Sequence, residues 1–157
     1  MQDYSLSLIP PEVLANKART LSEDLRLNFG EYIPHVTLCW AGNDVQDIQF
    51  SPSGNKYLIH IRGFYCDVDQ KDRVWVGLRV ELTDELVKLR AEYISDDAVR
   101  SGKLYFPHLT LGCITKESLE GVSFSPLKDL AAVNGAYEFS LHLCHNGKFG
   151  KVIEVLS

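Results

Sequence analysis

Apolar and polar residues alternate over several short stretches of the chain, as they do in strands that bury one face. The clearest alternation runs from Arg73 to Glu81. Two other stretches have apolar residues near the 3.6-residue spacing of an amphipathic helix. The pattern predicts strands at Tyr4–Ile9, Pro34–Trp40, Tyr57–Asp67, Arg73–Glu81, Lys103–Ile114, Tyr137–Cys144 and Lys151–Leu156, and helices at Glu12–Asn28 and from Thr83 to about Ser101.

Residues that favour turns and helix ends separate these stretches. Pro10 and Pro11 end the first strand, and Pro11 lies near the start of the first helix, where proline is favoured. Thr83 is expected to cap the second helix through its hydroxyl group. Gly30 and Gly102 are expected to end the two helices, and Gly63 to form a bulge. Turns are expected at Asp69–Asp72 and Asn146-Gly147, a loop at residues 43–55, and a short helix at Leu127–Val133.

The order of these elements nearly repeats itself along the chain. It reads strand, helix, strand and two strands, then helix, strand and two strands, with no linker or low-complexity segment between the halves. We therefore expect one bilobal α+β domain spanning residues 1–157. It should contain two pseudo-symmetric antiparallel sheets, with the helices packed outside and a central cleft between the sheets.

A seven-residue pattern occurs twice, once in each half. Residues 32–38 read Tyr-Ile-Pro-His-Val-Thr-Leu and residues 105–111 read Tyr-Phe-Pro-His-Leu-Thr-Leu, so five of the seven positions are identical. In a strand, residues two apart share a face, which places His35 with Thr37 and His108 with Thr110. The aliphatic residues between them then face a core, and the polar pairs line a cleft.

Two histidines that share a cleft form an acid–base pair near neutral pH. Displacement at phosphorus needs one group to take a proton from the attacking oxygen and another to give a proton to the departing oxygen. His35 and His108 are the candidates, and the sequence leaves open which is the acid. The hydroxyl groups of Thr37 and Thr110 could each donate a hydrogen bond to a non-bridging oxygen. His60 and His142 are expected to be packing residues, and His145 a surface group.

The composition of the chain limits the classes of binding partner. The formal charge is −5 and 24% of the residues are charged, which argues against a long electrostatic contact with duplex nucleic acid. A compact anionic ligand is still compatible with local positive charge from Arg62, Arg73, Lys103 or Lys148. No apolar run approaches the ~20 residues that span a bilayer, and the N-terminus lacks a signal peptide pattern. We expect a cytoplasmic monomer without a membrane partner.

Cysteine spacing gives no indication of a metal site. Cys39, Cys66, Cys113 and Cys144 are scattered, without a Cys-x-x-Cys pair, so buried free thiols are expected. The two His-x-Thr segments could meet around a metal, but threonine is a poor ligand beside the thiolates and carboxylates that zinc prefers. No metal or other cofactor is expected.

The motifs His35-Val36-Thr37 and His108-Leu109-Thr110 resemble the paired His-x-Thr/Ser signature of the two-histidine phosphoesterase superfamily. Within it, the chain looks most like the cyclic phosphodiesterases of the plant and yeast type. The similarity covers essentially the whole chain, including Tyr4-Ser5-Leu6, Gly63-Phe64-Tyr65, Val74-Trp75-Val76 and Phe139–Cys144. The resemblance implies that His35 and His108 are the acid and base, and that Thr37 and Thr110 bind phosphate oxygens.

Tyr105, just before the second motif, matches an aromatic residue of that family and is the first candidate for a substrate contact. Trp75 is the second candidate. Either could equally pack in the core, and stacking on an aromatic ring tolerates any base. Neither residue therefore defines the substrate.

Three functions remain open from the sequence. The first is metal-independent hydrolysis of a nucleoside 2′,3′-cyclic phosphate or of ADP-ribose 1″,2″-cyclic phosphate to a phosphomonoester. The second is cleavage of 2′,5′- or 3′,5′-linked oligonucleotides, linear or cyclic, including antiviral signalling nucleotides. The third is a non-catalytic module that binds a nucleotide or an RNA end.

Overall fold

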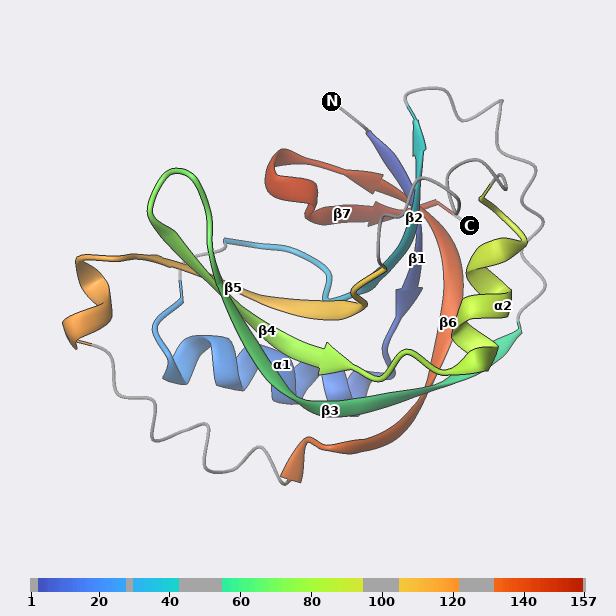
Figure 1. Cartoon of the computed structure of the whole chain (residues 1–157), viewed down its shortest axis with the longest axis horizontal. Coiled ribbons are helices and arrows are strands. Elements are labelled where there is room, and N and C mark those ends of the chain that lie inside the picture. Colours follow the sequence, from blue (N-terminus) through green and yellow to red (C-terminus); the bar gives the residue numbers. More distant parts are fainter. Residues whose placement is uncertain (1–2, 28–29, 43–54, 95–104, 122–131, 157) are drawn as a thin grey trace.

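The computed structural model describes residues 3–27, 30–42, 55–94, 105–121 and 132–156 (Figure 1). The described part is an α+β fold with an extensive antiparallel sheet. Its elements are β1 (Tyr4–Ile9), α1 (Glu12–Asp24), β2 (Val36–Gly42), β3 (Lys56–Val68), β4 (Arg73–Val80), α2 (Asp84–Ala91), β5 (His108–Thr115), η2 (Ser118–Gly121), β6 (Gly135–Asn146), η4 (Lys148–Gly150) and β7 (Val152–Val155).

The strands of the described chain join into one hydrogen-bonded sheet in the order β1-β2-β5-β4-β3-β6-β7. β1 also pairs with β6, so the first six strands in this order close into a ring, and β7 continues from the end of β6. Figure 1 shows β3 and β6 curving across the molecule, with α1 beneath the sheet near β5 and α2 at the other end. The sheet is therefore continuous through its hydrogen bonds.

An apolar core holds the helices against the sheet. In α1, Leu14, Ala18 and Leu21 are buried, at the spacing that the sequence pattern predicts. Ser22 on the same helix donates a hydrogen bond of 2.8 Å to the carbonyl oxygen of Leu111 in β5. Strand β4 buries its alternate aliphatic residues and turns the residues between them to the opposite face; the buried residues are Val74, Val76, Leu78 and Val80.

The first helix ends earlier than predicted. It stops at Asp24, not near Asn28, because Arg26 adopts a left-handed conformation with φ 56°. The amide of Leu27 then donates to the carbonyl oxygen of Ser22, closing the helix end as in a Schellman motif. Arg26 occupies the position that glycine usually takes, so the prediction from Gly30 placed the helix end too late.

The second helix is also shorter than predicted. Thr83 caps it as expected, accepting a hydrogen bond from the amide of Leu86 at 3.2 Å. The helix nevertheless ends at Ala91, where the amides of Glu92 and Tyr93 bond to carbonyl oxygens three residues back. Its buried residues are Leu86 and Leu89, and Tyr93 and Ile94 beyond its end also pack against the core. The predicted end near Ser101 and the glycine stop at Gly102 lie outside the described residues.

Several strand boundaries shift, whereas the local irregularities agree with the prediction. β5 starts at His108, five residues after the predicted Lys103, because Pro107 has no amide hydrogen to donate. The register shift in β3 falls between Ile61 and Phe64, around Gly63 with φ 90°, which confirms the bulge. The predicted loop at residues 43–55 and the short helix at Leu127–Val133 lie almost entirely outside the described residues.

The last hairpin is wider than a tight Asn-Gly turn. Asn146 remains inside β6 and pairs with Val152, and η4 lies between the two strands. The side-chain Nδ2 group of Asn146 donates to the carbonyl oxygen of Gly150 at 3.0 Å, which holds the loop closed. Phe149, at the tip, has φ 62° and is 45% exposed. The turn was therefore located correctly but has a different length.

Candidate active site

The two copies of the repeated pattern meet in the sheet. β2 and β5 pair antiparallel through Val36 and Leu109, the central residues of the two His-x-Thr motifs. Because antiparallel strands run in opposite directions, the residue after Val36 lies opposite the residue before Leu109, and the residue before Val36 lies opposite the residue after Leu109. Thr37 therefore lies toward His108, and His35 toward Thr110.

Burial follows the predicted alternation. Val36, Leu38, Leu109 and Leu111 are all at most 1% exposed. Thr37, His108 and Thr110 are half-buried on the opposite face of the strands. The predicted division of each motif into an aliphatic core face and a polar face is confirmed, and His35 differs only in being almost fully buried, at 8% exposed.

Both histidines are held by the same hydrogen bond. The Nδ1–H group of His35 donates to the carbonyl oxygen of Ile33 at 2.9 Å, and that of His108 donates to the carbonyl oxygen of Phe106 at 2.8 Å. A carbonyl oxygen can only accept, so Nδ1 carries the proton in each ring. The Nε2 atom of each neutral ring is then left with its lone pair, ready to accept a proton.

The two imidazole groups differ in their environment. The pKa of His35 is lowered to about 4: burial is the main cause, the hydrogen bond to Ile33 acts against it, and the electrostatic interaction with His108 adds a smaller lowering effect. His35 is therefore neutral at neutral pH. His108 is more open to solvent than His35.

Two hollows, each of about 480 Å³, meet at His108 and Phe106, which line both. The first, here the Thr110 hollow, also contains Tyr65, Cys66, Asp67, Trp75, Thr110 and Phe149. The second, here the Thr37 hollow, also contains Thr37, Leu38, Cys39, Trp40, Arg90, Tyr93, Ile94 and Tyr105. Together they form a groove with one motif threonine on each side of His108. His35 is not among the residues that line either hollow.

The two predicted aromatic contacts lie on opposite sides of His108. Tyr105 lines the Thr37 hollow, where its hydroxyl group donates to the carbonyl oxygen of Thr37 at 2.6 Å. Burial raises the pKa of Tyr105 well above its usual range. Trp75 lines the Thr110 hollow and is half-buried. Tyr105 thus combines a packing role with a position in the groove.

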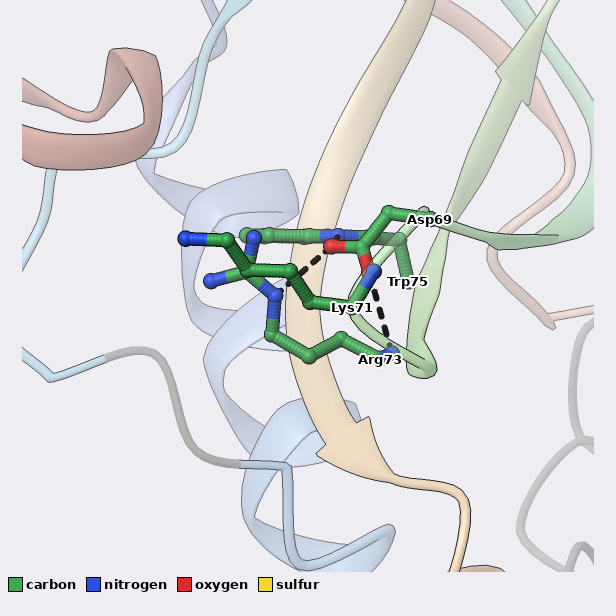
Figure 2. A network of polar contacts seen from close by, with 4 residues as sticks. All are labelled: Asp69, Lys71, Arg73 and Trp75. Carbon is green, nitrogen blue, oxygen red and sulfur yellow. Dashed lines mark hydrogen bonds and ion pairs between the residues drawn. The ribbon is translucent and has the colours of Figure 1, made fainter.

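A carboxylate fixes the orientation of Trp75. Asp69 accepts hydrogen bonds from the indole Nε1–H of Trp75 at 2.9 Å and from Nε–H of Arg73 at 2.6 Å (Figure 2). The backbone amides of Lys71 and Arg73 donate to its other oxygen, at 2.8 and 3.0 Å. These bonds, that of Trp75 above all, hold the pKa of Asp69 far below its usual range. The β3–β4 turn therefore holds one wall of the Thr110 hollow.

Tyr65 completes the wall beside Thr110. Its ring packs edge-on against His108, with 4.9 Å between ring centroids, and its hydroxyl group lies 3.5 Å from Oγ1 of Thr110. Burial raises the pKa of Tyr65 to about 12, so it is a neutral phenol that can donate. Tyr65 can thus orient both functional groups of the second motif.

Buried serines support Thr37 from the other side. Ser7 in β1 pairs with Thr37, and its Oγ lies 2.8 Å from Oγ of Ser5. Ser5 donates its hydroxyl proton to Oδ1 of Asn146 at 2.8 Å, so Ser7 must donate to Ser5. Both serines are fully buried, and this chain connects the first motif to the loop that carries Phe149.

Sequence reasoning missed several residues of the groove, among them Tyr65, Arg90, Phe106 and Phe149. Phe106 could have been found, because it lies two residues before His108 within the repeated pattern. Among the basic residues that were considered, Arg73 pairs with Asp69 and Arg62 pairs with Glu81. Lys103 lies outside the described residues.

The thiols agree with the prediction in part. All four cysteines are free, and Cys39 and Cys144 are buried, which raises their pKa values to about 11 and about 12. Cys66 is exposed and Cys113 half-buried, contrary to prediction. Cys66 lies in the exposed end of β3, where it lines the Thr110 hollow, and Cys113 is the partner of Trp75 on the face away from the core. Among the described residues, no three His, Cys, Asp or Glu side chains converge as a metal site would require.

Comparison with the models of known protein families found no match, and no curated protein matches the chain. The resemblance to two-histidine phosphoesterases therefore rests on the two sequence motifs and the similarity around them. None of the helices that the structure describes is long and apolar enough to cross a membrane.

Proposed function

We propose that the protein is a two-histidine phosphoesterase that hydrolyses ribose cyclic phosphates, a nucleoside 2′,3′-cyclic phosphate or ADP-ribose 1″,2″-cyclic phosphate, without a metal. The observation that carries the proposal is the identical hydrogen bonding of His35 and His108. Each ring donates its Nδ1–H group to the carbonyl oxygen two residues back and has a threonine two residues ahead. In-line displacement at phosphorus needs two proton-transfer groups, one for the attacking and one for the departing oxygen, and the duplicated motif supplies two histidines held in the same tautomer.

The burial of His35 suggests how the two roles are divided. As a neutral imidazole, His35 takes the proton of the attacking water on Nε2 while the water oxygen bonds to phosphorus. His108, entering the step protonated, gives its Nε2 proton to the ribose oxygen as the bond between that oxygen and phosphorus breaks. The product is a phosphomonoester. Thr37 and Thr110 donate to the non-bridging oxygens, where negative charge accumulates.

The proposal includes a two-lobed, pseudo-symmetric arrangement of the site. Each motif strand follows a helix and pairs antiparallel with the strand before that helix. β2 follows α1 and pairs with β1, and β5 follows α2 and pairs with β4. A pseudo-twofold axis through the contact of Val36 and Leu109 would exchange the two motifs. The same axis would place the substrate phosphate between them.

The test is incubation of the EDTA-treated protein with 2′,3′-cyclic AMP, followed by chromatography of the products. We expect a single adenosine monophosphate from the wild type and a loss of about 10²–10⁴-fold in rate for His35→Ala and for His108→Ala. His60→Gln is the matched control, because His60 lies on β3 outside both hollows. Turnover of either alanine variant at near wild-type rate would exclude the mechanism.

A second candidate function is cleavage of 2′,5′- or 3′,5′-linked oligonucleotides, linear or cyclic. It is favoured by one observation: the groove continues on both sides of His108, with aromatic residues in both hollows. A substrate with a nucleoside on each side of the reacting phosphate would occupy both. A panel of linear and cyclic oligonucleotides, compared with 2′,3′-cyclic AMP at equal concentrations, separates the two candidates by their kcat/KM values.

A further inference from the structure

The tyrosine that begins each copy of the repeated pattern makes the same kind of contact, and each makes it with the other copy. The hydroxyl group of Tyr32, in the first copy, donates to the carbonyl oxygens of Thr110 and Leu111, at 3.1 Å in each case. The hydroxyl group of Tyr105, in the second copy, donates to the carbonyl oxygen of Thr37 at 2.6 Å. The bonds therefore cross between the two halves of the chain, and both reach the backbone of a motif threonine.

The two helices make a second pair of crossed contacts, one residue further along each motif strand. Ser22 of α1 donates to the carbonyl oxygen of Leu111 in β5 at 2.8 Å. Arg90 of α2 donates through its Nε–H group to the carbonyl oxygen of Leu38 in β2 at 3.2 Å. Because α1 precedes β2 in the chain and α2 precedes β5, each helix bonds to the motif strand of the opposite half. The exchange of donors is thus duplicated, as the motifs are.

The two motif strands share little of a hydrogen-bonded ladder. In the described sheet, β2 and β5 pair only at Val36 and Leu109, whereas β5 pairs with β4 from Thr115 to His108. A single pair of residues leaves the relative position of two strands weakly defined. The hydroxyl groups of the two motifs would nevertheless have to act on one phosphate, where a displacement of about 1 Å can cost about 10²-fold in rate. The crossed hydrogen bonds supply the missing constraint.

Both tyrosines are suited to this role as neutral donors. Burial raises the pKa of Tyr32 to about 12, against a lowering effect of Arg19, and it raises the pKa of Tyr105 well above its usual range. Tyr32 lines neither hollow of the groove, so it reaches the site through the backbone of β5. Tyr105 lines the Thr37 hollow, but its hydroxyl proton is used in the bond to Thr37. The crossed bond is therefore what the two tyrosines share.

We propose that Tyr32 and Tyr105 are a reciprocal pair of positioning residues, each of which holds the motif threonine of the other half in place. The inference rests on the proposed function and deepens it: Tyr32 sets the position of the Thr110 hydroxyl group, and Tyr105 sets that of Thr37. Neither tyrosine takes part in proton transfer. The proposal gives a role to the tyrosine that both copies of the pattern contain, which proton transfer and phosphate binding leave unexplained.

A crossed double-mutant cycle on the full chain tests this pairing. Tyr32→Phe and Tyr105→Phe each remove one hydroxyl group, and we expect each to lower kcat for 2′,3′-cyclic AMP by about 10- to 100-fold with little change in KM. The effect of Tyr32→Phe should be largely lost in a Thr110→Val background and kept in a Thr37→Val background. Tyr105→Phe should show the reverse.

Tyr137→Phe is the matched control. Tyr137 also donates to a backbone carbonyl oxygen, that of Val133 at 2.7 Å, and it lies outside both hollows. All three phenylalanine variants should lower Tm by about 2–4 °C, the shift for one hydrogen bond in a chain of this length, but Tyr137→Phe should keep the wild-type kcat. If Tyr32→Phe fails to fold, Ser22→Ala, which removes the other first-half donor to Leu111, takes its place with the same expected coupling.

Three kinetic outcomes would overturn the inference. Equal losses of kcat in the two threonine backgrounds would mean that the tyrosines act on the fold as a whole. A rise in KM with unchanged kcat in Tyr105→Phe would make Tyr105 a substrate contact. Wild-type kcat in both tyrosine variants would show that the crossed bonds do not position the threonines.

Hydrogen–deuterium exchange separates failure of this inference from failure of the proposed function, because it needs no turnover. If the wild type hydrolyses no cyclic phosphate or oligonucleotide, the proposed function is wrong, and exchange still tests the crossed bonds. We expect exchange to be about 5- to 10-fold faster in β5 of Tyr32→Phe and in β2 of Tyr105→Phe, and unchanged in both strands of Tyr137→Phe. Exchange that is unchanged, or that rises equally in all strands, would overturn the inference.

Discussion

The ring of Tyr65 lies over Gly77, its partner on the neighbouring strand β4. A Cβ atom at residue 77 would collide with this ring and would lie 2.7 Å from the carbonyl oxygen of Leu109. Gly77 is also the partner of Thr110 in β5, so its missing side chain lets Tyr65 reach across one strand to the second motif. The glycine thus positions a tyrosine beside His108 and Thr110.

Gly77→Ala should therefore displace Tyr65 and impair the site. We expect overpacking to lower the free energy of unfolding by about 1–3 kcal/mol, and kcat to fall with it because Thr110 and His108 lose their neighbour. Chemical denaturation and kinetics with a cyclic phosphate substrate measure the two effects. Gly121→Ala is the control, since a Cβ atom there meets nothing within 4 Å. A Gly77→Ala protein as stable and active as wild type would contradict this role.

Local pattern predicted much of the fold. β1 begins and ends at the predicted residues, and both the Thr83 cap and the bulge at Gly63 were correct, because each depends on neighbours in the sequence. The pairing of β1 with β6 was not predictable in this way. It joins Ser7 to His142, residues far apart in the chain, and no local propensity encodes such a contact.

The residues of the candidate site also fall into two groups: those that the local sequence pattern predicted and those that only tertiary packing brings together. The two His-x-Thr motifs were visible because the chain repeats them, and the alternation within each strand gave their orientation. Arg90 and Phe149 carry no comparable signal. One lies on a helix at the site's edge and the other in a loop with a left-handed backbone, and only tertiary packing brings them to the groove.

The burial of His35 should make stability depend on pH. Its pKa is about 4 in the folded protein and 6.5 when unperturbed, so the unfolded chain binds the proton first as the pH falls. The stability associated with neutral His35 is complete above pH 6.5 and is lost progressively down to about pH 4. A shift of this size corresponds to about 3 kcal/mol.

Denaturant titrations of the wild type and of His35→Gln, made between about pH 7 and pH 4, test this dependence. We expect the difference between the two unfolding free energies to shift by roughly 3 kcal/mol in favour of the variant over that range. The remaining titratable groups are the same in both proteins, so their contributions to the pH dependence of the unfolding free energy largely cancel in the difference. His60→Gln should run parallel to the wild type. Parallel curves for His35→Gln would show that His35 is not buried as a neutral group.

The hydroxyl group of Thr110 should contribute to the rate and not to the fold. Thr110→Val keeps the shape of the side chain and removes the donor, so we expect kcat to fall by about 10²–10³, as when one donor to a developing charge is lost. Thr110→Ser keeps the hydroxyl group and should retain most of the rate. Steady-state kinetics on a cyclic phosphate substrate measures both. Equal activity in the valine and serine variants would show that Thr110 does not stabilise the reacting phosphate.

Asp69 should influence the groove by holding Trp75 and Arg73 in place. Asp69→Asn removes the negative charge that accepts from both side chains, and we expect the indole ring to become mobile and the Trp75 wall of the Thr110 hollow to loosen. Because this wall lies beside the phosphate and not on it, KM should rise by about 3- to 10-fold, as for the loss of one ordinary hydrogen-bonded contact, with a smaller change in kcat.

Because Trp40 is the only other tryptophan, fluorescence of the Trp40→Phe background reports on Trp75 alone. Lys71→Gln, which leaves the backbone bond to Asp69 intact, is the control. An unchanged Trp75 spectrum and an unchanged KM in Asp69→Asn would mean that the carboxylate does not orient the ring.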